Sequence, residues 1–166
     1  MDFLSSALII GTGATAATDA WSLARSKWFG VPAPKWGLVG RWIAQMPQGR
    51  FRHQSIAAVP AARAEVLIGW IAHYVIGIVF AALLLAIGGR DWMADPTLAP
   101  ALLFGIATVL APFLILQPGM GAGIAASRTP RPSAARLQSL LTHTIFGLGL
   151  YAAGWINSSL NPWSLS

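Results

Sequence analysis

Four long apolar stretches divide the chain, and polar segments rich in proline or glycine separate them. The stretches cover residues 3–24, 65–88, 98–117 and 137–157. Each matches the about 20 residues that a helix needs to cross the hydrocarbon core of a bilayer. No stretch sustains the alternation of apolar and polar residues that marks a membrane β-barrel. Because lipid leaves an open chain no other way to pair its backbone groups, all four are predicted to be transmembrane helices.

A shorter helical pattern lies between the first two stretches. Trp36, Val39, Ile43 and Met46 recur at helical spacing, and polar or charged side chains lie between them. The segment 35–46 is too short to cross a bilayer. It is therefore predicted to be an amphipathic helix that lies on the inner leaflet.

The composition of the chain is typical of an integral membrane protein. Of the 166 residues, 55% are hydrophobic and 10% are charged, and the mean hydropathy is +0.62. A soluble domain carries about 25% charged residues, and a soluble domain this short could not bury so much apolar surface. The chain has no cysteine, which excludes thiolate zinc sites, iron–sulfur clusters and thiol redox chemistry. We therefore expect one membrane domain over residues 1–166.

The positive charge of the chain is concentrated on one side of the predicted membrane. The net charge is +6, and every basic residue except Arg90 lies in the loop after the first stretch or in the loop after the third. By the positive-inside rule these loops face the cytoplasm, so both termini are expected in the periplasm of a bacterial inner membrane. The basic residues alternate with apolar interfacial ones, which favours lipid over nucleic acid as the partner. Those expected to contact anionic lipid headgroups are Arg41, Arg50, Arg52, Arg128 and Arg131.

The two halves of the chain resemble each other. Residues 7–11 align with 101–105, and 73–77 align with 143–147, where each begins with histidine and ends with glycine. The alternative is a chance likeness in a sequence rich in Ala, Leu and Gly. A parallel repeat would relate two tandem helix hairpins by an axis along the membrane normal. The predicted fold is therefore all-α, an integral membrane four-helix bundle of two tandem hairpins plus the inner-leaflet helix.

Each predicted span carries a polar side chain into the cytoplasmic half of the bundle. These residues are Asp19, His73, Gln117 and His143, and such residues are costly in lipid and usually face the bundle interior. Small residues lie one turn from each histidine and allow a helix or a flat ligand to approach closely. They are Gly69, Gly77, Ser139 and Gly147.

The paired histidines leave several functions open. Imidazole can ligate haem iron, bind zinc or copper, relay protons, or pack with one hydrogen-bond partner. The leading hypothesis is a non-enzymatic binding or accessory protein, or a subunit of a larger membrane assembly, as a homo-oligomer or with other membrane-protein subunits. One alternative is a small redox or ion-handling protein that binds haem or metal through His73 and His143. Another is a small proton-coupled transporter that also uses Asp19. No catalytic triad, paired carboxylate or nucleotide fingerprint supports an enzyme.

Two further features of the loops have simple interpretations. His53, in the first basic loop, is expected to be solvated. The glycine-rich segment 119–123 suggests a phosphate loop only weakly, because it follows a membrane helix rather than a strand. These glycines are expected to end the third span and to let the backbone pass close to the fourth.

Several longer sequence strings give a resemblance to a known family. They are Gly40-Arg41-Trp42, residues 49–53, residues 69–74, Gln117-Pro118 with the glycines and Ala125-Ala126-Ser127 that follow, and Leu141-Thr142-His143 with Gly147. In these strings the chain resembles an uncharacterised bacterial inner-membrane family, the domain of unknown function 2938, over nearly its whole length. The resemblance implies a membrane protein with four spans and assigns no activity to it.

Overall fold

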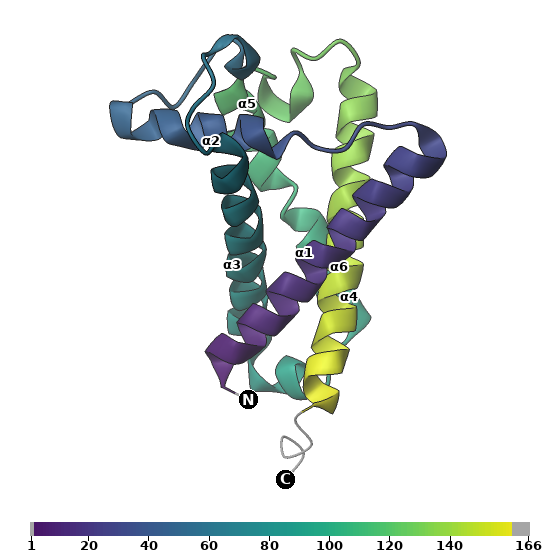
Figure 1. Ribbon diagram of the computed structural model, residues 1–166. Coiled ribbons are helices and arrows are strands. Elements are labelled where there is room, and N and C mark those ends of the chain that lie inside the picture. Colours follow the sequence, from purple (N-terminus) through teal and green to yellow (C-terminus); the bar gives the residue numbers. More distant parts are fainter. Residues whose placement is uncertain (1, 161–166) are drawn as a thin grey trace. The chain divides into compact units, whose positions relative to one another are not determined.

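A computed structural model describes residues 2–160 of the chain (Figure 1). All regular structure in this range is helical. The chain forms two compact units. The first unit comprises Met1–Ala33, Tyr74–Thr108 and Leu141–Ser166, and the second comprises Pro34–His73 and Val109–Leu140.

The helices follow the apolar stretches of the sequence. Short helical turns are found at η1 (Met46–Gln48), η2 (Ile56–Ala58) and η4 (Ile124–Ala126), and a π-helix at η3 (Pro112–Leu116). The α-helices are α1 (Phe3–Phe29), α2 (Trp36–Gln45), α3 (Glu65–Ala94), α4 (Leu98–Ala107), α5 (Gln117–Met120) and α6 (Pro132–Ser159). Within α3 the helical geometry is interrupted at Gly89, whose φ is 67°.

Three helical segments are long and apolar enough to cross a membrane. They are α3, the continuous stretch Leu98–Met120 and α6. Helix α1 has 27 residues and is not among them. Its many Ser, Thr and Gly residues, together with Asp19, lower its hydropathy. The crossing of the membrane by α1 therefore stays a prediction.

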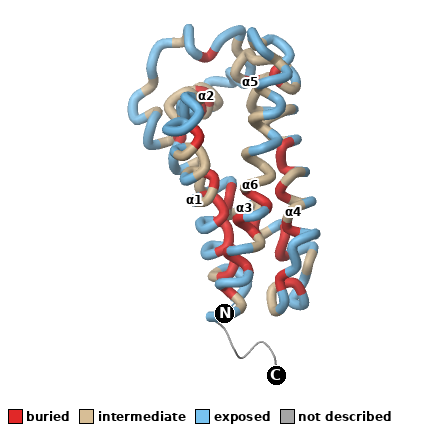
Figure 2. The backbone as a smooth tube through the Cα atoms, turned by 90° about the vertical axis from the view of Figure 1, so that its right-hand side faces the viewer, coloured by how far each residue is buried: buried red, intermediate tan, exposed pale blue. Residues whose placement is uncertain are grey.

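The core of the first unit is built by four helices. Buried apolar side chains of α1, α3, α4 and α6 form one cluster. Figure 2 marks the buried residues of these helices in red along the backbone. Ile10 and Leu150 are among its largest fully buried members. Alanines such as Ala14, Ala81 and Ala101 are also fully buried, and small residues of this kind allow helices to pack closely.

Glycines bring helix backbones into direct contact in the first unit. A side chain on Gly11 of α1 would overlap the backbone of Gly77 and Ile78 in α3. A side chain on Gly105 of α4 would likewise overlap the backbone of Gly147 in α6. Only glycine permits such approaches, because it has no Cβ.

In the second unit, α2 packs on the first turns of α3 through two glycines and an ion pair. A side chain on Gly40 would overlap the Glu65 backbone, and one on Gly69 would overlap the Trp36 carbonyl. The Arg41 guanidinium donates two hydrogen bonds of 2.8 Å to the Glu65 carboxylate. This bidentate geometry is the strong form of the Arg–carboxylate pair. Helix α2 is therefore fixed by its partners within the chain, and a position on the inner leaflet stays a prediction.

The third apolar stretch contains the π-helix η3 where the sequence places Pro112. Proline has no N–H for the Thr108 carbonyl, and its ring would clash with that carbonyl in a regular α-helix. The wide turn follows the proline, where the Gln117 N–H donates to the Pro112 carbonyl five residues earlier. On the N-terminal side the Phe113 N–H still donates to the Val109 carbonyl four residues earlier. Pro112 and the π-helix that begins at it both lie within the continuous helical stretch Leu98–Met120.

Candidate functional site

The four polar residues of the predicted site are divided between the two units. Asp19 and His143 belong to the first unit, and His73 and Gln117 to the second. Each has its own neighbours within its unit.

Asp19 is joined to α3 by a hydrogen bond. The Tyr74 hydroxyl donates to Asp19 Oδ2 at 2.9 Å. This bond links α1 to α3, two helices that also meet at Gly11 and Gly77. A carboxyl group on an apolar helix thereby gains a donor that lowers the cost of its burial.

His143 is oriented by Thr108 of the same unit. The Thr108 hydroxyl donates to the Gly105 carbonyl at 2.5 Å and lies 2.8 Å from His143 Nδ1. A hydroxyl has only one hydrogen, so when Thr108 donates to Gly105, Nδ1 is the donor to Thr108 and Nε2 keeps a lone pair. A hydrogen bond from one ring nitrogen is found both in histidines that only pack and in histidines that ligate a metal. The bond to Thr108 therefore does not distinguish the two roles.

His73 lies in an aromatic cluster of the second unit. Its ring stacks on the Trp36 indole, with centroids 3.9 Å apart and planes inclined by 23°. The Trp70 ring meets the imidazole at 5.9 Å in an edge-on arrangement. Because Trp36 begins α2 and the other two rings lie on α3, the cluster also holds α2 against α3.

Gln117 lies against the first part of α6. Its amide donates to the Ser139 hydroxyl at 3.4 Å, which is a long hydrogen bond. Gln117 Oε1 is buried and has no hydrogen-bond partner among residues 2–160. Within the same residues no group of three or more His, Asp or Glu side chains is close enough to hold a metal ion.

The predicted packing glycines contact helices of the same chain. Gly77 lies against the Thr15 hydroxyl and the Gly11 carbonyl, Gly147 against the backbone of α4, and Gly69 against Trp36. In these contacts the small residues bring together helices of one chain.

The arginines predicted to contact lipid differ in their surroundings. Arg41 binds Glu65 and also donates to the Val59 carbonyl at 2.7 Å. Its hydrogen bonds to Glu65 raise the pKa of Arg41, and a contact of this guanidinium with lipid stays a prediction. Arg50, Arg52, Arg128 and Arg131 form no ion pair or side-chain hydrogen bond within the described range 2–160.

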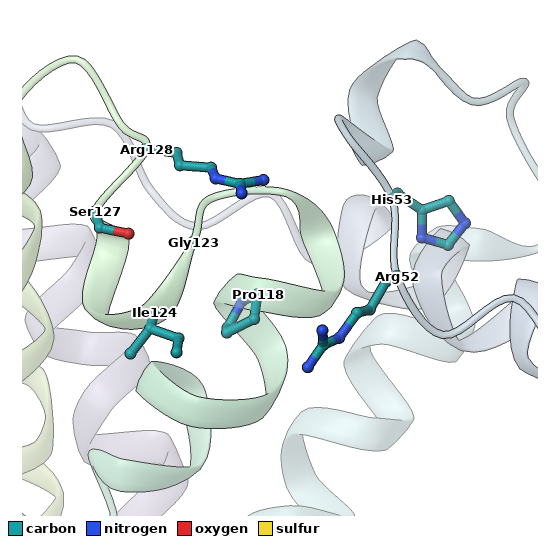
Figure 3. A pocket seen from close by; sticks show the side chains of 7 residues that line it. All are labelled: Arg52, His53, Pro118, Gly123, Ile124, Ser127 and Arg128. Atoms are coloured by element: carbon teal, nitrogen blue, oxygen red, sulfur yellow. The ribbon is translucent and has the colours of Figure 1, made fainter.

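Two of these arginines line a pocket of about 310 Å³ in the second unit, shown in Figure 3. Its lining residues come from two distant parts of the sequence, the loop after α2 and the segment after η3. They are Arg52, His53, Pro118, Gly123, Ile124, Ser127 and Arg128.

The sequence alone does not reveal this pocket. His53 is not simply solvated, because its backbone N–H donates to the Gly119 carbonyl at 2.9 Å and its Nδ1 lies 3.3 Å from the same oxygen. The glycine segment passes close to the first loop, where a side chain on Gly119 would meet the Trp42 indole and one on Gly121 the Gln54 carbonyl. The charges and the glycines are visible in the sequence, but the 66-residue separation between His53 and Gly119 hides their contact.

The comparisons with known proteins identify a family and no activity. No curated protein and no solved structure matches the chain. The model of one family, described as "Protein of unknown function (DUF2938)", matches residues 8–157. This match covers most of the chain and agrees with the resemblance in the sequence strings, so the chain belongs to the DUF2938 family.

Proposed function

We propose that this chain is an integral protein of the bacterial inner membrane that acts as a binding or accessory subunit rather than as an enzyme. One observation supports this proposal: the most apolar 18-residue stretches of the long helices are largely uncovered by the chain itself. The buried share of this stretch is only 22% in α3, 22% in Leu98–Met120 and 33% in α6. Exposed apolar surfaces of this extent mark membrane or protein contacts.

The proposal includes a four-helix bundle of two tandem hairpins. The glycine contacts described above support it, because Gly11 and Gly105 occupy equivalent positions of the sequence repeat, as do Gly77 and Gly147. Gly11 meets Gly77 between α1 and α3, and Gly105 meets Gly147 between α4 and α6. Each half thus joins its two helices at the same repeat positions.

The topology predicts which residues can be labelled from outside. The chain has no cysteine, so a single introduced cysteine reports on its own position. A membrane-impermeant maleimide applied to intact spheroplasts is expected to label Ser159→Cys and not Gln48→Cys. Both side chains are exposed. Gln48→Cys should react only after the membrane is opened. Labelling of Gln48→Cys in intact spheroplasts would contradict periplasmic termini.

The proposed accessory role predicts that the chain is not alone in the membrane. When the membrane is extracted with a polymer that keeps native lipid, particles are expected to contain at least one further polypeptide beside the 17.5 kDa chain. Co-expression of copies with two different tags then separates the outcomes. Recovery of both tags together shows a homo-oligomer. Particles that hold one copy and no other protein would overturn the accessory role.

Haem binding, metal binding and proton-coupled transport stay predictions. The contacts of His73 with Trp36 and of His143 with Thr108 are compatible with packing and with ligand binding alike.

A further inference from the structure

We propose that the pocket between Arg52, Ser127 and Arg128 binds a phosphate group. The proposal adds to the proposed function a ligand of stated chemistry, which the two loops would bind. It rests on that function only where the membrane is taken as the source of the ligand. In Figure 3 the Arg52 and Arg128 side chains extend from two separate segments, with Arg128 above Pro118 and Arg52 to its right.

The charge of the pocket is uncompensated. Both guanidinium groups lack an ion pair or a hydrogen bond among the residues described, and none of the lining residues is acidic. Guanidinium groups match the geometry of phosphate oxygens and can bind them through two parallel hydrogen bonds. Two arginines on a shared pocket therefore favour an anion with several oxygens.

The backbone around Ser127 and Arg128 is held in place before any ligand binds. The Arg128 N–H donates to the Ala122 carbonyl at 2.8 Å, and the Ser127 N–H donates to the Ile124 carbonyl at 3.0 Å. Gly123 has a φ of 76°, and a side chain there would overlap the Ser127 hydroxyl. A preorganised loop lowers the entropy cost of binding.

The other wall of the pocket is anchored to the same segment. His53 is bonded to Gly119 through its backbone N–H, which fixes the backbone next to Arg52. Its Nε2 is buried without a hydrogen-bond partner in the described part of the chain. Because His53 and Arg52 both line the pocket, this anchored backbone gives the second wall a fixed position before a ligand binds.

The phosphate can come from two sources, an anionic lipid headgroup or free phosphate. To separate them, the full chain is purified in a neutral detergent and titrated calorimetrically with two probes. One is short-chain phosphatidylglycerol below its micelle concentration, and the other is inorganic phosphate. We expect at least one probe to bind. Heat from phosphatidylglycerol alone assigns the site to lipid, and heat from inorganic phosphate alone assigns it to the free anion.

Substitutions connect the binding to this pocket. Arg52→Gln and Arg128→Gln are each expected to lower the affinity for the probe that binds the native chain by about tenfold. The reason is that a hydrogen bond to a charged group contributes about 1.5 kcal/mol or more. Arg63→Gln is the matched control, because Arg63 is exposed in the same unit and lies outside the pocket. It should change the affinity less than twofold.

A further variant and a check of folding keep the proposal testable if Arg52→Gln or Arg128→Gln does not fold. Arg128→Lys keeps the charge without the paired donors and should bind more weakly than the native chain but better than Arg128→Gln. Circular dichroism confirms that each variant keeps its helices. The proposal is overturned if neither probe binds the native chain, or if Arg52→Gln and Arg128→Gln bind as tightly as Arg63→Gln. The labelling of Gln48→Cys is independent, so a wrong topology and an absent phosphate site give different results.

Discussion

Replacing Gly105 by valine is expected to destabilise the chain by about 3 kcal/mol, at the upper end of what overpacking costs. The new side chain would overlap the Gly147 backbone. A neighbouring side chain could rotate away, but a helix backbone can yield only if α4 and α6 move apart. Reversible unfolding in mixed micelles, followed by circular dichroism, measures the loss.

The control for this substitution is Gly37→Ala in α2. A methyl group there would meet mainly the end of the Val66 side chain, at 3.3 Å, and that side chain can adjust. Alanine is also favoured over glycine in a helix by about 1 kcal/mol. We therefore expect Gly37→Ala to leave the stability unchanged or slightly raised. Equal losses in the two variants would show that close helix contact is not the reason.

Trp42→Ala is expected to cost a similar free energy, about 3 kcal/mol, as for other buried tryptophans. Trp42 is 9% exposed. Its indole donates to the Phe51 carbonyl at 2.9 Å and covers Gly119. The substitution removes the side chain that joins α2, the first loop and the glycine segment. Amide hydrogen exchange of residues 51–54 and 119–123 should therefore accelerate together.

Trp28→Ala provides the comparison, because Trp28 is 72% exposed at the end of α1. It removes the same side chain without opening a cavity and should lose little stability in detergent. If Trp42→Ala unfolds no more easily than Trp28→Ala, the indole does not hold the loops together. If only residues 51–54 exchange faster, the link to the glycine segment is wrong.

The sequence pattern predicts the helices well and their contacts poorly. The long apolar stretches, the polar segments and Pro112 are local features, so an all-α chain with long apolar helices and an irregularity at Pro112 can be inferred from them. Helix α1 shows the limit of this reasoning. Hydroxyl side chains and Asp19 can lie on a helix face that other helices cover as well as on a face that is exposed. Hydropathy alone therefore does not decide whether α1 crosses the membrane.

The site depends on contacts that no local pattern contains. The polar residues of the predicted site could be listed from the sequence, but the partner of His143 is Thr108 and the partner of Asp19 is Tyr74. Likewise the charge of Arg41 indicates a lipid contact when only the sequence is known. The structure adds a partner within the chain, Glu65, which is 24 residues away, and the lipid contact stays a prediction. These pairings follow from helix packing, which a single sequence does not specify.

The π-helix has a consequence for chains of slightly different length. Its hydrogen bonds span five residues instead of four, so η3 can be regarded as an α-helix that has absorbed one inserted residue. Deleting one residue from Phe113–Ile115 would then restore an α-helical turn and leave Gln117 and Gly119 facing nearly as before. A deletion in a regular helix would instead rotate everything after it by about 100°. A family member one residue shorter here can therefore keep the loop contacts.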